Sequence, residues 1–168
     1  MKLKIKVKVF KSGELPKIIS KGDWIDLKAA ETVKLTPPTL DKDGNIVVTD
    51  FKVNLGVAMK LPDGFEAIIN DRSSTYLSWG IIMSNLQGVI DNAYSGDDDE
   101  WKFVGITLGK KRDTIKKGDR ICQFRIQLSQ KATMWQKLKW LFSSGIEFEQ
   151  EKHLSAISRG GFGITGTN

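Results

Sequence analysis

The chain has 168 residues, of which 40% are hydrophobic and 27% charged, a composition typical of one globular domain with a hydrophobic core. Its single cysteine, Cys122, excludes an intrachain disulfide, and its single histidine, His153, excludes a multi-histidine metal site and disfavours a Ser-His-Asp triad. The net charge of +6 is equally compatible with binding nucleic acid or a small polyanion such as a nucleoside triphosphate. The lysines are spread out without an aromatic-rich basic motif, which disfavours specific nucleic-acid binding.

Taken in chain order, the apolar residues form short, regularly spaced segments that are typical of β-strands. Residues 2–10 alternate Lys with Leu, Ile and Val, which predicts an edge strand whose lysines face water. Turns are expected at Pro62-Asp63-Gly64 and Lys117-Gly118-Asp119. Further strands are expected within residues 46–60, 65–69, 79–83, 101–108 and 120–128. This pattern predicts an all-β barrel or sandwich.

The segment Gly88-Val89-Ile90-Asp91-Asn92-Ala93-Tyr94 combines a small residue, two aliphatics, a carboxylate and an aromatic. If Val89 faces the core of a strand, Asp91 faces it too, because side chains alternate with period 2. A carboxylate in that position either closes a turn or has a chemical role. The acidic stretch that follows, residues 97–100, is expected to be a solvated hairpin loop rather than a metal site.

Residues 133–143 interrupt the β pattern. Met134, Leu138, Leu141 and Phe142 recur at helical spacing, and Ser143-Ser144-Gly145 ends the segment, so we expect a short helix that packs on the barrel or on a neighbouring subunit. A surface that binds a partner or a membrane is the alternative. Beyond it, residues 159–168 are rich in glycine and are expected to be mobile unless a ligand orders them.

No apolar run reaches the roughly 18 residues that span a bilayer, and the N-terminus alternates rather than forming the continuous apolar stretch of a signal peptide. We therefore expect a cytoplasmic protein, in the host cytoplasm if it is phage-encoded, with no membrane partner.

Five segments occur in an order and spacing that resemble the five motifs of the trimeric deoxyuridine triphosphatases (dUTPases), especially those of bacilli and their phages. The resemblance runs from about residue 20 to the C-terminus. It implies a distorted jelly-roll β-barrel over residues 1–168, with residues 155–168 as a flexible arm that closes over an active site. The segments are Gly22-Asp23-Trp24-Ile25-Asp26-Leu27, Asp71-Arg72-Ser73-Ser74, Gly88 to Tyr94, Gly118-Asp119-Arg120-Ile121-Cys122-Gln123, and residues 159–168.

The resemblance also implies a homotrimer with active sites shared between subunits, and cleavage of dUTP to dUMP and pyrophosphate with Mg²⁺ on the triphosphate. Asp91 would activate the attacking water as general base. Tyr94 would lie against the deoxyribose and exclude a 2′-hydroxyl. The amide of Asn85, with the backbone near Gly88, would read uracil, since an amide offers both a donor and an acceptor.

Other motif residues are expected to serve the phosphates. Arg72 and Ser73 would bind them, with Ser73 donating to the oxygen of the scissile bridge. Ser74 would support the same loop, and Gln123 would offer a neutral amide to a phosphate. Asp26 would assist the hydrated Mg²⁺ through water.

The tail carries the last expected contacts. Phe162 would cover the uracil ring, and Arg159 with Thr165, close to Gly163, would grip the γ-phosphate. Arg159 lies only three residues before Phe162, a shorter spacing than most family members show, so the phosphate grip is expected to be partly rearranged.

Two other functions stay open at the level of sequence. A dCTP deaminase-type enzyme shares the fold, although Asp91 and Tyr94 favour the hydrolase. A dUTPase-fold regulatory protein that binds a repressor or another protein is the second, and residues 133–143 are where such a surface is expected.

Overall fold

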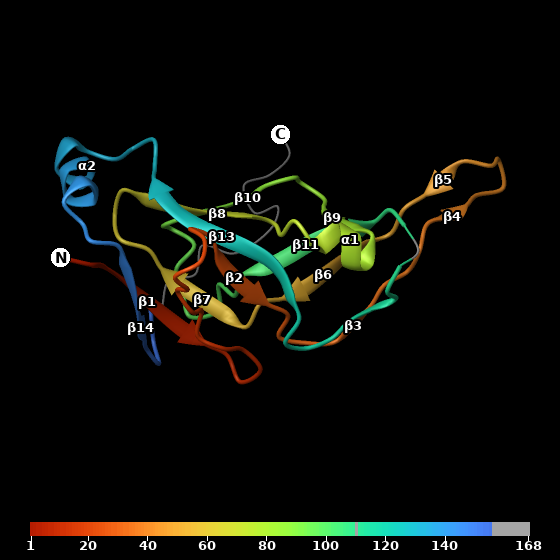
Figure 1. Cartoon of the computed structure of the whole chain (residues 1–168), viewed down its shortest axis with the longest axis horizontal. Helices are drawn as coiled ribbons and strands as arrows, with labels where there is room; N and C mark the ends of the chain where they lie inside the picture. Colours follow the sequence, from red (N-terminus) through yellow and green to blue (C-terminus); the bar gives the residue numbers. More distant parts are fainter. Residues whose placement is uncertain (110, 156–168) are drawn as a thin grey trace.

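The computed structural model describes residues 1–109 and 111–155, and their architecture confirms the all-β prediction (Figure 1). Three main sheets carry most of the strands. The first has the order β14-β1-β7, the second β10-β8-β13-β2 and the third β6-β11-β9. Two short ribbons, β12-β3 and β4-β5, lie outside them, and the second of these projects from the body as an arm (Figure 1).

The described part of the chain contains the following helices and strands: β1 Leu3–Val9, β2 Ile25–Lys28, β3 Val33–Lys34, β4 Thr39–Leu40, β5 Ile46–Val47, β6 Asp50–Asn54, β7 Val57–Lys60, β8 Phe65–Asp71, α1 Thr75–Trp79, β9 Ile81–Met83, β10 Gly88–Asp91, β11 Lys102–Thr107, β12 Thr114–Ile115, β13 Arg120–Leu128, α2 Met134–Leu141 and β14 Ile146–Gln150. Neither of these two helices is long and apolar enough to cross a membrane.

One hydrophobic core joins the sheets. Phe65 of β8, Phe103 of β11 and Phe124 of β13 are fully buried, as is Trp101 just before β11. Trp101 meets Phe124 edge to face, with ring centroids 5.3 Å apart, a favourable arrangement for two aromatic rings. Phe124 stands opposite Ile69 near the end of β8, so this contact holds the motif-bearing ends of β8 and β13 against the interior.

The edge-strand prediction for residues 2–10 is wrong in position and right in orientation. β1 lies between β7, antiparallel to it, and β14, parallel to it and about 140 residues later in the chain. Its apolar residues Leu3, Ile5 and Val7 are buried, whereas its lysines face outward and pair with acids of other segments, as Lys6 does with Glu151 at 3.6 Å. Alternation predicts which face of the strand is exposed to solvent, but it does not show that a strand from a distant part of the sequence pairs with it.

The expected strand over residues 79–83 begins two residues late. Trp79 ends α1, and Gly80 follows in the left-handed conformation at φ 69° before β9 starts at Ile81. Glycine adopts this conformation without the steric cost that a Cβ brings, which is why it is common directly after a helix.

β10 is present as predicted, but its faces are the reverse of those assumed for Val89. Val89 is 58% exposed, whereas Gly88 and Ile90 turn toward the body. Asp91 therefore shares the outward face of Val89. A Cβ at Gly88 would meet Ile69 of β8 at 3.4 Å, an ordinary contact distance, so Gly88 lies close against its neighbouring strand.

The acidic stretch, residues 97–100, is not the solvated loop that was expected. Asp99 is 2% exposed and accepts the Gly96 N–H at 2.7 Å, while Glu100 accepts the Gly56 N–H at 2.9 Å. Asp97 accepts the Leu154 N–H at 2.7 Å. Three of the four carboxylates therefore accept backbone N–H groups of the fold, and that of Asp97 ties the end of the described chain to the body.

The predicted helix over residues 133–143 is confirmed as α2, with a capping box between Thr133 and Gln136. Its contact with the body is made by Trp140, whose ring lies 5.4 Å from that of Phe65. Within one chain, three of the four residues expected to pack on the barrel or on a neighbouring subunit are exposed, Met134 at 68%, Leu141 at 72% and Phe142 at 75%, so packing on a neighbouring subunit stays a prediction.

Candidate active site

The first group of motif residues gathers where β8 ends and the chain turns into α1. Thr75, fully buried, accepts the Arg72 N–H at 3.2 Å and donates its hydroxyl to the Ile121 carbonyl at 2.8 Å, which fixes the loop against β13. The Arg72 guanidinium donates from Nε to Asp26 Oδ1 at 2.6 Å and from Nη1 to the Ser74 hydroxyl at 3.2 Å. The arginine is thereby held in one direction.

Asp26 is shared by two arginines. Its second oxygen accepts Arg120 Nη1 at 3.0 Å, and Arg72 also donates to the Arg120 carbonyl at 3.2 Å. We call Asp26, Arg72, Ser74 and Arg120 the arginine cluster. Two guanidinium groups against one carboxylate leave it with an excess positive charge, which suits a phosphate chain, and planar arginines bind phosphate oxygens in pairs. Ser73 lies beside the cluster with an exposed side chain.

Gln123 adjoins the cluster from β13. It stands opposite Asp26 of β2 and Asn70 of β8, and its Nε2 donates to the Asp71 carbonyl at 3.1 Å. One donor of the amide is therefore used inside the fold. Gln123 therefore lies beside the arginine cluster, and its contact with a phosphate stays a prediction.

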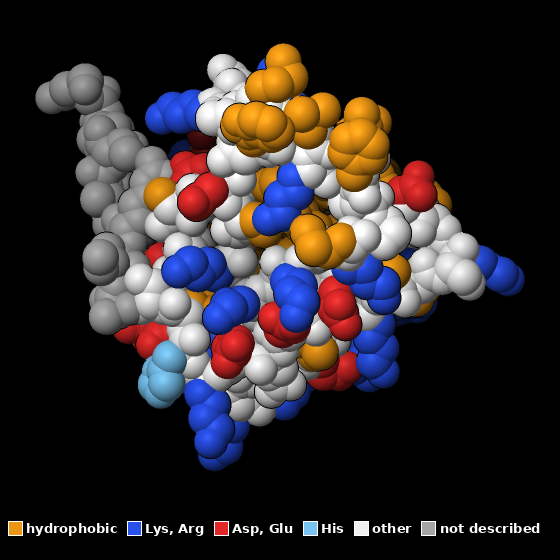
Figure 2. Space-filling model, turned by 90° about the vertical axis from the view of Figure 1, so that its left-hand side faces the viewer, with side chains coloured by type: hydrophobic (Ala, Val, Ile, Leu, Met, Phe, Trp, Pro, Cys, Tyr) orange, Lys and Arg blue, Asp and Glu red, His pale blue; other side chains and the backbone are white. Residues whose placement is uncertain are grey.

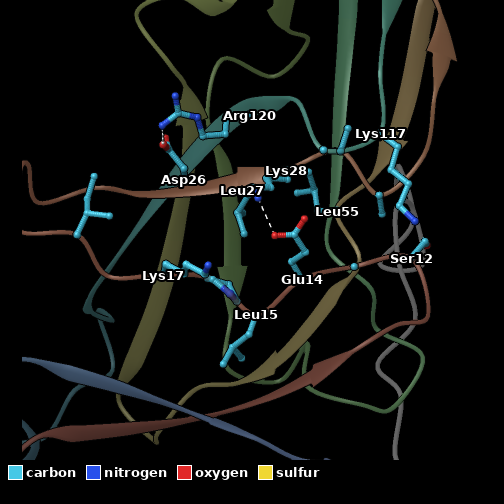
Figure 3. A pocket seen from close by; sticks show the side chains of 16 residues that line it. Ser12, Glu14, Leu15, Lys17, Asp26, Leu27, Lys28, Leu55, Lys117 and Arg120 are labelled. Atoms are coloured by element: carbon cyan, nitrogen blue, oxygen red, sulfur yellow. Dashed lines mark hydrogen bonds and ion pairs between the residues drawn. The ribbon is translucent and has the colours of Figure 1, made fainter.

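A cavity of about 330 Å³ flanks the cluster between β2 and the loop of residues 12–19 (Figure 3). In Figure 3, Asp26 and Arg120 point toward each other at its upper edge, and the side chains of Lys17 and Lys117 lie further around it. The Glu14 carboxylate accepts Lys28 Nζ at 2.6 Å across the middle. The basic residues around this cavity extend the positive potential of the cluster.

The second group lies around the end of β10. Asp91 accepts the Ala93 N–H on its carboxylate at 3.1 Å and the Tyr94 N–H on its carbonyl at 3.1 Å, so it closes a tight turn. The Tyr94 hydroxyl donates to the Glu100 carbonyl at 3.1 Å, and burial raises the pKa of this phenol, with a smaller contribution from Asp99 and Glu100. Asp91 and Tyr94 are therefore neighbours on one turn.

A third element, the turn of residues 84–88, connects β9 to β10 and carries Asn85 and Gly88. Asn85 is exposed, and its carbonyl accepts the Gln87 N–H at 2.6 Å. Leu86 adopts a left-handed conformation at φ 59°, which is strained for a residue with a Cβ. The turn presents polar backbone groups and an amide to solvent, as recognition of a nucleobase edge requires.

The structure does not bring Asp91 to the arginine cluster within one chain. Asp91 stands opposite Glu66 near the start of β8, whereas the cluster lies beyond Asp71 at the other end of that strand. Five residues of strand separate Glu66 from Asp71, which corresponds to about 17 Å. A water held by Asp91 cannot reach a phosphate bound to Arg72 of the same chain.

Two residues of this region were given no role from the sequence. Arg120 lies inside a quoted motif, and its position next to the Gly118-Asp119 turn is the signal that could have marked it as a partner of Asp26. Asp71 directly precedes Arg72, but nothing in the sequence indicates that its carboxylate is partly buried. The expected tail residues Arg159, Phe162, Gly163 and Thr165 lie outside the described residues.

Comparison with known proteins identifies the family of this chain. A family model described as dUTPase matches residues 11–139. The chain is 45% identical to an SPbeta prophage-derived deoxyuridine 5′-triphosphate nucleotidohydrolase of Bacillus subtilis, over 89% of this chain and 87% of that protein. It is 34% identical to the deoxyuridine 5′-triphosphate nucleotidohydrolase of Rickettsia canadensis, over 92% of this chain and 89% of that protein.

Solved structures confirm the jelly-roll-like dUTPase fold. The dUTPase of Streptococcus mutans superposes with a TM-score of 0.63 at 19% identity, covering 76% of this chain and 98% of that one. A dUTPase of phage phi11 of Staphylococcus aureus, which coordinates a structural Mg(II) ion, gives a TM-score of 0.59 at 18% identity, covering 77% and 94%. With the motif segments and the family model in agreement, the chain belongs to the dUTPase family.

Proposed function

We propose that this protein hydrolyses dUTP to dUMP and pyrophosphate, and so keeps uracil out of DNA. The observation that carries the proposal is the arginine cluster at the end of β8, where Arg72 and Arg120 converge on Asp26 with net positive charge. Membership of the dUTPase family supplies the substrate, because the similar proteins from B. subtilis and R. canadensis are named for this activity.

The active site is proposed to be shared between subunits of a homotrimer. Because Asp91 and the arginine cluster lie about 17 Å apart along β8, a complete site needs the Asp91 end of one copy next to the cluster of another. Closed rings of identical subunits create such heterologous contacts three times over.

Each group then has its own task. Asp91 accepts a proton from the water that attacks the α-phosphate, while Arg72, Arg120 and Ser73 stabilise the negative charge that develops on the phosphates. The turn of residues 84–88 binds the uracil edge through Asn85 and backbone groups, with Gly88 giving close access. Tyr94 lies under the sugar.

Gln123 of β13 supports the phosphates beside the cluster. The remaining contacts come from residues 155–168, which we propose as an arm of a single domain spanning residues 1–168. Phe162 covers the base, and Arg159, Gly163 and Thr165 hold the γ-phosphate. The enzyme would act in the cytoplasm, that of the host if a phage encodes it.

The described residues do not fit a resident metal site. No group of three or more His, Cys, Asp or Glu side chains able to hold a metal occurs in residues 1–109 and 111–155. Both carboxylate oxygens of Asp26 are already paired with Arg72 and Arg120. A metal ion bound directly to Asp26, or a metal-bound water that Asp26 contacts, would have to compete with these two arginines. We propose that Mg²⁺ arrives bound to the triphosphate, as part of the substrate, since phosphate oxygens and water satisfy its octahedral preference.

The test of the function is pyrophosphate release from dUTP, dTTP, dCTP and UTP with the wild-type protein and Mg²⁺. We expect selective cleavage of dUTP. Release of ammonia from dCTP would instead indicate the deaminase-type activity, and cleavage of UTP at a similar rate would contradict the proposed role of Tyr94.

A second candidate function, binding of a protein partner, is favoured by the outer face of α2. Figure 2 shows hydrophobic side chains gathered over this end of the molecule, with lysines among and below them. Trp135 is 80% exposed and continues the apolar stripe of Met134, Leu141 and Phe142. Lys137 and Lys139 flank the stripe on either side of the helix, and the sequence has no Asp or Glu from residue 129 to 146.

The partner would therefore carry carboxylates around an apolar surface. A second copy of the chain does not suit this surface, because the lysines that flank the two apolar stripes would repel each other. The double variant Trp135→Glu with Phe142→Glu should hydrolyse dUTP at the wild-type rate and keep the wild-type Tm, but lose a partner that the wild type captures from host extract. Ile46→Glu, at a 73% exposed apolar position on the β4-β5 arm, is the control that should keep the partner. Capture by all three proteins alike would refute the α2 surface.

A further inference from the structure

Three consecutive polar residues at the end of β8 each contact a different part of the molecule. Asn70 accepts Gln87 Nε2 on its side-chain oxygen at 3.2 Å, and Asp71 Oδ2 accepts the Met83 N–H at 3.1 Å. Arg72 then donates to Asp26. The end of β8 thus joins the turn of residues 84–88 to the arginine cluster.

The contact between Asp71 and Met83 crosses from one sheet to another. β9 pairs with β11, whereas β8 pairs with β10 and β13, so no strand ladder joins β8 to β9. Met83 is the last residue of β9, directly before the turn. On the other side, β11 holds the same point, because Met83 pairs with Gly105 and the Ser84 N–H donates to the Val104 carbonyl at 3.0 Å. The Asp71 carboxylate is therefore the acceptor that ties the start of the turn to β8.

The turn needs such support. Leu86 is held in the left-handed region at φ 59°, a conformation that residues with a Cβ rarely adopt. Within the turn, the Leu86 N–H bonds to the Met83 carbonyl at 3.1 Å, so a shift of Met83 is passed on to Leu86 and to Asn85 between them.

Stability does not explain a carboxylate at this position. Asp71 Oδ1 is buried and has no hydrogen-bond partner among the described residues, and burial raises the pKa of this carboxyl, although the bond from Met83 opposes the shift. A buried oxygen without a partner lowers stability, and a neutral side chain would avoid the cost of burying charge. Such a group is retained where it places something else.

We propose that Asp71 is a positioning residue that holds the turn of residues 84–88 in register with Arg72 and thereby sets affinity and selectivity for the base. This rests on the proposed function in assigning the turn to uracil. Asp71 itself does not contact the substrate. It acts through the Met83 backbone on one side and through the direction of the chain into Arg72 on the other.

The test compares Asp71→Ala with Asp71→Asn, whose amide oxygen still accepts the Met83 N–H. Loss of a hydrogen bond to a charged acceptor corresponds to about a tenfold change, so Asp71→Ala should raise the KM for dUTP by about tenfold and lower the preference for dUTP over dCTP by a similar factor. The value of kcat should change less than about threefold. Asp71→Asn should restore KM to within about threefold of the wild type.

Glu31→Ala is the matched control, since the Glu31 carboxylate likewise accepts a backbone N–H, that of Asn54 at the end of β6, at 2.9 Å. It should leave KM and base preference unchanged. An Asp71→Ala protein with the kinetics of Glu31→Ala would overturn the proposal. If Asp71→Ala does not fold, Asp71→Glu, which moves the carboxylate by one methylene, decides by the same criterion of raised or unchanged KM.

Amide hydrogen exchange separates this proposal from the function on which it rests. Exchange of the Met83 amide proton should be faster in Asp71→Ala than in the wild type and in Asp71→Asn. Unchanged exchange would contradict the role given to the bond between Asp71 and the Met83 N–H. A wild-type protein that does not cleave dUTP would refute the proposed function, whereas the exchange result would still report on Asp71.

Discussion

Replacing Asp91 with Asn is expected to lower kcat for dUTP by roughly 10³-fold, because an amide cannot accept the proton of the attacking water. Asn keeps an oxygen that can accept the Ala93 N–H, so the turn at residues 91–94 should survive and the Tm should stay close to that of the wild type. The KM for dUTP should change little, because Asp91 acts in the chemical step. Steady-state pyrophosphate release measures kcat and KM, and thermal unfolding measures Tm.

Asp41→Asn is the control for the alternative that Asp91 only closes a turn. Asp41 accepts the N–H groups of Asp43 and Asn45 at 2.9 and 2.8 Å at the tip of the β4-β5 arm, so it is a turn-closing aspartate remote from β10. Asp41→Asn should hydrolyse dUTP normally. An Asp91→Asn protein with equal activity would show that Asp91 is structural and that another group activates water.

Mixing two inactive variants is expected to restore activity. Asp91→Asn lacks the base and Arg72→Ala lacks the guanidinium, so each alone should be nearly inactive. In trimers formed from an equal mixture, a site that takes Asp91 from one chain and Arg72 from the next is intact in about a quarter of cases. Activity should therefore return to roughly a quarter of the wild-type value after co-expression or joint refolding.

The double variant with both changes, mixed equally with wild type, is the control. Shared sites predict about a quarter of full activity in that mixture, whereas sites built within one chain predict about half. Sites within one chain also predict no recovery from the two single variants, since no chain then carries both residues. Either of those results would refute the shared site and the 17 Å separation on which it rests.

The sequence predicted the parts of the fold that depend on local periodicity and local turns. Alternation in residues 2–10 identified the buried positions Leu3, Ile5 and Val7, and helical spacing after residue 133 identified α2. Both patterns are set by residues close in the chain, so they can be read without a partner strand. The position of β1 between β7 and β14 could not, because its parallel partner lies about 140 residues away.

Orientation was the weakest inference wherever two faces of an element were chemically similar. Val89 was considered as a core-facing residue of its strand, yet it is 58% exposed, and Gly88 and Ile90 face the body instead. In α2 the apolar residues were expected to pack on the barrel or on a neighbouring subunit, and within one chain Trp140 makes the contact with the body and leaves the stripe exposed. Hydrophobicity alone does not tell which of two apolar faces meets the core.

By itself, the sequence determined the family of this protein, because motif residues with fixed chemistry recur in a fixed order along the chain. Only the tertiary structure decided how those residues combine. It placed Arg72 and Arg120 on one carboxylate, Asp71 under the turn that follows β9, and Asp91 at the opposite end of β8. These relations join segments up to 94 residues apart, as between Asp26 and Arg120, and they follow from sheet register and side-chain direction, which no local pattern encodes.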